Sequence, residues 1–240
     1  MLPATADVIC KFVELAEAAP EELTTIANVM PAPPAPFVPA EKQGQLVIMA
    51  LMVYAGDVAA GQKAIAPFRA LAAPVADMVK PMPYPEIYPP MEEDYHPVVA
   101  IRSLFADRID RPAAELIMER LSNSTATMRV AQVRVLGGAM ARISDDATAY
   151  AHRGQRMMVN IVAMFERPEQ TAEHQAWADD FAGAMSQGND GAYVNFLADE
   201  GEARIRTAYP GQCWDRLVSV KNRYDPDNLF RLNHNIDPQA

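Results

Sequence analysis

Residues 126–136, Ala-Thr-Met-Arg-Val-Ala-Gln-Val-Arg-Val-Leu, alternate between two sets of side chains. One set is Arg129, Ala131, Val133 and Val135, and the other is Met128, Val130, Gln132 and Arg134. Because successive side chains of a strand point to opposite faces of a sheet, this pattern predicts a strand with two unlike faces. We expect the first set to face the core. A sheet with one buried face and one polar face is typical of antiparallel strands.

Further strands and helices are predicted on both sides of this stretch, from apolar runs and from apolar residues at steps of three and four. The expected strands cover residues 23–30, 45–54, 75–82, 98–105 and 157–165. The expected helices cover residues 5–19, 57–73, 113–121, 168–185, 202–209 and 214–223. Strands that come in pairs, without regular strand–helix alternation, favour an α+β fold with an antiparallel sheet and helices packed mainly on one face.

The composition indicates a globular chain and excludes two classes of partner. Half of the 240 residues are hydrophobic, and 21 Lys and Arg against 31 Asp and Glu give a net charge of −10. A surface this acidic repels nucleic acid and anionic membranes, so we expect neither as a partner. The longest apolar run, residues 46–55, is much shorter than the roughly 20 residues that span a bilayer.

Cysteine and histidine usage predicts no metal site. Cys10 and Cys213 are the only cysteines, and the four histidines are scattered along the chain without the spacing of zinc ligands. The sequence also lacks GxGxxG, GxxxxGK[ST] and GxSxG motifs. The usual sequence signals for nucleotide binding and for a serine hydrolase are therefore missing. Sparse cysteine and a start without a basic, long apolar leader predict a cytoplasmic location.

Two polar motifs have both a structural and a functional interpretation. Tyr193 and Asn195 are two residues apart, and in an extended segment they project to the same side. A phenol and an amide placed together can serve as a base and an orienting group. His152 and Arg153 could bind an acidic group of a substrate, or they could face solvent at the end of a strand. The pattern alone supports these two interpretations equally.

The C-terminal run resembles a family signature. Residues 221–236 read Lys-Asn-Arg-Tyr-Asp-Pro-Asp-Asn-Leu-Phe-Arg-Leu-Asn-His-Asn-Ile. This run is similar to the pattern K-x-x-Y-D-P-x-N-x-F-R-x-N-Q-N-I of berberine-bridge-enzyme-like FAD-linked oxidoreductases, flavoproteins of the vanillyl-alcohol-oxidase type, and it departs only at His234. Ala-Tyr-Val-Asn-Phe at 192–196 resembles the Y-x-N segment of that family. Gly-Gly-Ala at 137–139 and Thr-Ala-Tyr-Ala-His-Arg at 148–153 resemble its G-G-A and T-A-F-x-H-R region.

The resemblance implies a domain organisation. Members of the family hold FAD in an N-terminal domain, and a second domain with a broad antiparallel sheet covers the flavin ring and builds the substrate pocket. By this resemblance, residues 1–190 are the substrate-binding domain, and residues 191–240 are the C-terminal segment that returns to the FAD domain. The FAD domain is expected elsewhere, in a longer parent chain or on a separate subunit. FAD binding is therefore expected only when such a domain is supplied.

The resemblance also implies roles for individual residues. Tyr193 is the candidate base that takes a proton from a substrate hydroxyl or amine as hydride leaves for the flavin. Because an amide both donates and accepts hydrogen bonds, three asparagines are candidates for the polar edge of the flavin: Asn195, Asn233 and Asn235. His152 and Arg153 are candidates for contact with the substrate.

Two functions remain open on the sequence. In the first, the chain is the substrate-binding and C-terminal portion of an FAD-dependent oxidoreductase that oxidises a C–OH or C–N centre. Its expected partners are a small-molecule substrate and either a separate FAD-domain chain or a second copy. In the alternative, the chain is a stand-alone, non-catalytic module of the same descent that binds a small molecule or a partner.

Overall fold

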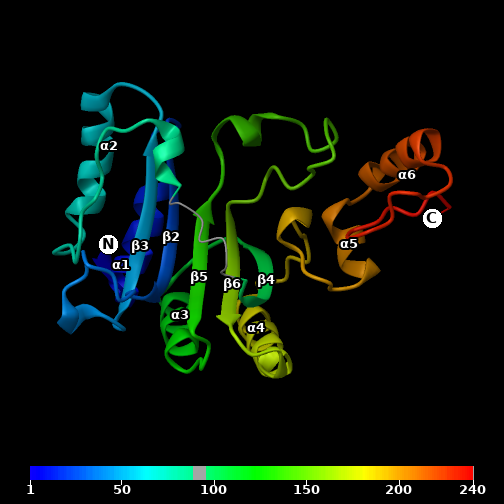
Figure 1. Cartoon of the computed structure of the whole chain (residues 1–240). Helices are drawn as coiled ribbons and strands as arrows, with labels where there is room; N and C mark the ends of the chain where they lie inside the picture. Colours follow the sequence, from blue (N-terminus) through cyan, green and yellow to red (C-terminus); the bar gives the residue numbers. More distant parts are fainter. Residues whose placement is uncertain (89–95, 240) are drawn as a thin grey trace.

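A six-stranded antiparallel sheet forms the centre of the protein, and its strand order is β1-β3-β2-β5-β6-β4 (Figure 1). The structure is a computed structural model, and it describes residues 1–88 and 96–239. The strands are β1 Leu2–Pro3, β2 Leu23–Pro31, β3 Leu46–Tyr54, β4 Val98–Ala106, β5 Met128–Val135 and β6 Met157–Phe165. Every neighbouring pair is antiparallel. The predicted α+β class is confirmed.

The helices differ in where they lie relative to the sheet. They are α1 Ala6–Glu17, α2 Val58–Arg69, α3 Arg111–Ser122, α4 Thr171–Met185, α5 Glu202–Ala208 and α6 Gln212–Tyr224. Helices α1, α2, α3 and α4 contribute to one apolar core with the strands, as the prediction of helices on one face requires. Figure 1 shows α5 and α6 to the side of the sheet, away from α1. In the described residues, no helix is long and apolar enough to cross a membrane.

Capping side chains explain where three of the helices begin. The side chains of Thr5, Asp57 and Asp110 accept hydrogen bonds from backbone N–H groups in the first turns of α1, α2 and α3. These bonds satisfy donors that have no partner inside a helix. The sequence placed the start of α1 and α2 correctly because both caps are recognisable residue types at the edge of an apolar pattern.

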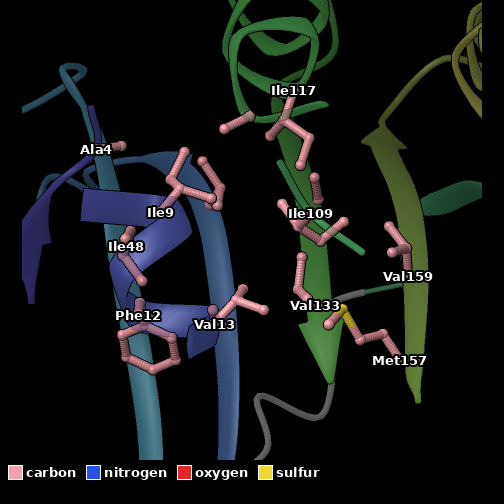
Figure 2. Packing of buried hydrophobic residues seen from close by; sticks show 14 of the residues in the cluster. Ala4, Ile9, Phe12, Val13, Ile48, Ile109, Ile117, Val133, Met157 and Val159 are labelled. Carbon is pink, nitrogen blue, oxygen red and sulfur yellow. The ribbon is translucent and has the colours of Figure 1, made fainter. Parts of the chain in front are cut away.

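The main apolar core lies on the face of the sheet that packs against the helices. Smaller sets of buried side chains, which include Val47 and Phe105, lie on the opposite face. Ala131 and Val133 of β5 are buried in it, as the alternation predicted. Figure 2 shows Phe12 and Val13 of α1 near Ile48 of β3, with Val133 and other strand residues farther along the same face. Gln132 and Arg134 alternate with these core residues and therefore lie on the opposite face, which we call the open face.

A row of amides crosses the open face. The strand register places Asn28 of β2 opposite Gln132 of β5, and Gln132 opposite Asn160 of β6. Gln132 Nε2 donates to Asn28 Oδ1 at 2.7 Å, and Asn160 Nδ2 donates to Gln132 Oε1 at 3.1 Å. Asn28 Nδ2 in turn donates to the backbone carbonyl of Met49 at 3.0 Å. This amide row links four strands through side chains as well as through the backbone ladder.

The prediction of a strand at residues 75–82 is wrong. This segment is irregular and pairs with no strand of the described sheet. Prolines 74, 81 and 83 lack backbone donors for a ladder. The segment is held instead by Arg69, whose guanidinium binds the Asp77 carboxylate at 2.6 Å and the Val79 carbonyl at 3.3 Å. An apolar run thus forms a β-strand only when a neighbouring strand is available to pair with it.

The position of the core predicts the effect of two phenylalanine substitutions. Phe12 is 1% exposed and Phe37 is 44% exposed. Phe12→Ala leaves a cavity beneath the sheet and should lower the free energy of unfolding by about 3–5 kcal/mol. Phe37→Ala, the matched control, should lower it by about 1 kcal/mol or less. Urea denaturation followed by circular dichroism measures both, and equal losses would contradict the placement of the core.

Candidate functional site

Tyr193 lies over the open face in a small pocket. The pocket has a volume of about 230 Å³ and is formed by residues of β5, β6, the β5–β6 connection and the α4–α5 connection. We call it the tyrosine pocket, and its principal lining residues are Arg134, Met140, Tyr150, Met158, Tyr193 and Phe196. The turn that follows Tyr193 also contacts β4. The segment after α4 therefore crosses the sheet face that the helices leave free.

The segment that carries Tyr193 and Asn195 is turned, and the prediction of a short, exposed, extended stretch is wrong. Val194–Phe196 form a single 3₁₀ turn, because the N–H of Phe196 donates to the carbonyl of Tyr193 at 2.9 Å. Ala192 is buried at the start of the segment. Asn195 nevertheless reaches Tyr193, since its Nδ2 donates to the phenol oxygen at 2.9 Å. The two side chains meet through the turn and not through strand alternation.

Aromatic rings support Tyr193 from one side. The Tyr150 ring packs edge-on against the Tyr193 ring, with 5.1 Å between centroids. The His152 ring lies 5.0 Å from Phe105 and 6.0 Å from Tyr150. Burial, followed by the neighbouring Tyr193, raises the pKa of the Tyr150 hydroxyl. Tyr150 therefore keeps its proton and remains a hydrogen-bond donor at neutral pH.

Arg134 is a residue of this pocket that sequence analysis missed. Its Nε donates to Gln132 Oε1 at 2.7 Å, and its guanidinium carbon lies 4.9 Å from the centroid of the Phe196 ring. Burial lowers the pKa of Arg134, and the nearby Tyr193 acts in the opposite direction. The available signal was its place on the open face, three residues before Gly137. A single arginine in an alternating strand is more often solvent-facing, so that signal was weak.

His152 and Arg153 lie beside the tyrosine pocket and do not line it. His152 is 7% exposed, and its Nε2 has no partner in the described residues. A Cβ at Gly191 would come within 3.0 Å of the His152 ring. Arg153 donates to Thr148 Oγ1 at 2.7 Å and to the carbonyl of Met140 at 3.2 Å. Both residues brace the loop that carries Tyr150, and their proposed contact with substrate stays a prediction.

The C-terminal tail reaches the same region through His234. A ring nitrogen of His234 lies 3.1 Å from the carbonyl oxygen of Leu197, next to the turn that carries Asn195. Asn235 Oδ1 is buried without a partner in the described residues. Asn233 is exposed and has a φ of 61°. The structure thus brings the predicted asparagines of the tail close in the fold to the Tyr193 turn.

Much of the C-terminal signature shapes a turn. The Asp225 carboxylate accepts hydrogen bonds from the N–H groups of Leu229 and Phe230 at 2.7 and 3.0 Å, and it pairs with Lys221. Lys221 Nζ also donates to the Phe230 carbonyl at 2.7 Å. This ion pair and the backbone donors hold the pKa of Asp225 below its usual range. Asp225 and Lys221 therefore have a structural explanation.

The tail and α6 expose an unusual amount of apolar surface. The exposed fractions of Tyr224, Leu229, Phe230 and Leu232 are 72%, 74%, 78% and 84%. Clustered apolar side chains of this kind usually mark an interface. In residues 1–88 and 96–239, no group of three His, Cys, Asp or Glu side chains could hold a metal ion.

Comparisons with known proteins match the chain to flavoenzymes. Residues 192–237 match the family model described as "Berberine and berberine like". The uncharacterized FAD-linked oxidoreductase YgaK of Bacillus subtilis is 31% identical over 105 residues, which is 44% of this chain and 23% of that protein. Tetrahydroberberine oxidase of Berberis wilsoniae is 25% identical over 172 residues, 63% of this chain and 31% of that protein. The chain thus spans only part of these relatives.

Solved structures share the fold. Berberine bridge enzyme from Eschscholzia californica superimposes with a TM-score of 0.70 at 17% identity, over 96% of this chain and 52% of that one. For 6-hydroxy-D-nicotine oxidase from Arthrobacter nicotinovorans the TM-score is 0.73 at 16% identity, over 97% of this chain and 51% of that one. The chain corresponds to about half of each structure.

The buried histidine predicts a pH dependence of stability. Burial lowers the pKa of His152 below its usual value near 6.5, so the unfolded chain binds the proton more readily. The contribution of neutral His152 to the free energy of unfolding should be complete above about pH 6.5 and should decline as the pH falls below that value. Denaturation at several pH values measures this slope. We expect the free energy of unfolding to fall less steeply with decreasing pH in His152→Gln than in the parent. In the exposed control His96→Gln, it should fall as in the parent. Parallel curves for the parent and His152→Gln would contradict the prediction.

Proposed function

We propose that this chain, which contains a domain of the berberine-bridge-enzyme-like FAD-linked oxidoreductases, forms the substrate-binding wall for oxidation of a C–OH or C–N centre. Residues 1–190 provide the sheet and pocket, and residues 191–240 provide the segment that joins the flavin domain. One observation carries the proposal. Tyr193 and Asn195 meet at 2.9 Å over the open face, within the residues that match the family model.

The amides in this region fit the polar edge of a flavin ring. Asn235 Oδ1 is buried and unpartnered among the described residues, so it can accept a hydrogen bond from a ring N–H. Asn195 and Asn233 are exposed and offer both a donor and an acceptor. These three asparagines would hold the ring edge once a flavin domain is in place. When bound, the flavin supplies the redox chemistry by accepting hydride from the substrate carbon.

Tyr193 is the proton acceptor in the proposed reaction. Its phenolate oxygen takes the proton as the substrate O–H or N–H bond breaks. The Asn195 amide already donates a hydrogen bond to that oxygen. Asn195 also fixes the direction in which the oxygen faces. Met158 and Phe196 supply apolar walls that limit water around the reacting atoms.

The exposed tail supports assembly with a flavin domain. Tyr224, Leu229, Phe230 and Leu232 are each more than two-thirds exposed. They lie within or next to the turn that Asp225 and Lys221 stabilise. A rigid turn that presents apolar side chains fits a docking segment better than a solvated tail. We propose a flavin domain as the surface that covers it, either in the same longer chain or on a separate subunit.

Tyr193→Phe tests the catalytic proposal. The variant keeps the ring contacts with Tyr150 and Phe196 and removes only the hydroxyl. In the enzyme assembled with its flavin domain, we expect flavin reduction by an alcohol or amine substrate to slow by about 10²- to 10⁴-fold. Anaerobic stopped-flow absorbance measures this rate.

The control for that experiment is Tyr88→Phe, because the Tyr88 side chain is 63% exposed and lies outside the tyrosine pocket. This control should reduce flavin at the parent rate. An undiminished rate in Tyr193→Phe, with flavin still bound, would sink the catalytic role. Absence of a flavin domain both in frame upstream of Met1 and in a neighbouring gene would instead favour a stand-alone binding module.

A further inference from the structure

Arg134 carries a charge that no carboxylate of the described chain neutralises. Eight other arginines, by contrast, form salt bridges with Asp or Glu within 4.0 Å. Arg129 and Arg153 are also half-buried without an acidic partner among the described residues, but their guanidinium groups donate to backbone carbonyls. The Nη groups of Arg134 have no such acceptor in the described residues, in a protein with a net charge of −10. Burying a charge is unfavourable unless it gains a partner. Because Arg134 lines a pocket, a bound anion is the candidate for that partner.

The amide row fixes the Arg134 side chain. Its Nε is held by Gln132 Oε1 at 2.7 Å, and Gln132 is held in turn by Asn28 and Asn160. Gln132 cannot turn away without breaking bonds to both neighbouring strands. The guanidinium is therefore oriented before a ligand arrives, which lowers the entropy lost on binding. Fixing Nε also leaves both Nη groups for another acceptor.

The rest of the pocket defines what that acceptor can be. The Phe196 ring covers one side of the guanidinium, and Met140 and Met158 give the pocket an apolar wall. The hydroxyls of Tyr150 and Tyr193 are the remaining polar groups among its lining side chains. A planar fork beside apolar walls is suited to a carboxylate on a small apolar body, because two parallel N–H groups match two carboxylate oxygens. An anion here would also offset the effect of burial, which lowers the pKa of Arg134.

We propose that the tyrosine pocket binds the carboxylate of its substrate through Arg134, so that the substrate is an alcohol or amine that carries a carboxylate. The inference rests on the proposed function for the bond that is oxidised. Binding of the carboxylate itself needs only residues of this chain, because Arg134, Gln132 and the pocket walls all belong to the sheet and its adjoining loops. It can therefore be tested without flavin.

Benzoate and benzamide provide a matched pair of probes, because they share a ring and differ in charge. Isothermal titration calorimetry on the 240-residue chain should show saturable binding of benzoate and at least tenfold weaker binding of benzamide. Arg134→Gln should weaken benzoate binding at least tenfold. Arg134→Lys keeps the positive charge and loses the two parallel N–H groups of the guanidinium. Its affinity for benzoate should lie between those of the parent and Arg134→Gln. Arg142→Gln is the control, because Arg142 is exposed and pairs with Glu21. It should bind benzoate as the parent does.

Three results would overturn the inference: no saturable benzoate binding by the parent, equal binding of benzoate and benzamide, or undiminished binding by Arg134→Gln. Should Arg134→Gln fail to fold, as judged by circular dichroism, Arg134→Lys supplies the same comparison. Tyr193→Phe separates this inference from the catalytic proposal. That variant should still bind benzoate, whereas the catalytic proposal is judged from flavin reduction alone. Either proposal can thus fail while the other stands.

Discussion

The structure depends on the alternation of β5, which places apolar side chains against the helices and polar side chains on the opposite face. Helices α1, α3 and α4 bury Ala131 and Val133 of β5, and the alternation of the strand then forces Gln132 and Arg134 to the open face. A slip of one residue in β5 would exchange the two sets, placing amides in the core and valines in the pocket. The register that stabilises the fold therefore also builds the wall of the candidate site. The amide row reinforces it, because the bonds of Gln132 to Asn28 and Asn160 form only when this register places the three amides side by side.

The second half of the site comes from chain that is distant in sequence and follows the sheet. Residues after α4 cross the open face as the Tyr193 turn, and His234 brings the tail back to Leu197. Asp225 organises the intervening turn through two backbone donors and Lys221. The most recognisable part of the family signature is thus explained mainly by chain geometry. Under the proposed function, its asparagines face the flavin and its apolar side chains face the flavin domain.

Sequence reasoning succeeded where the determinants are local. The alternation of β5, the starts of α1 and α2 and the limits of β6 are set by neighbouring residues, and all were predicted to within a residue or two. It failed at residues 75–82, where an apolar pattern lacks a partner strand. The Tyr193–Asn195 contact was expected for the wrong reason, because a 3₁₀ turn replaces the extended segment. Arg134 was missed because its significance lies in Gln132, Phe196 and Tyr193 together, and only the fold brings these residues into contact.

We propose that the open face and the tail, and not the helical face, meet the flavin domain. Hydrogen–deuterium exchange on the 240-residue chain, alone and assembled with a flavin-loaded domain, tests this claim directly. We expect slower exchange on assembly at residues 191–197 and 224–235, and unchanged exchange rates in α1, α3 and α4. Slower exchange confined to those three helices, with the tail unaffected, would contradict it.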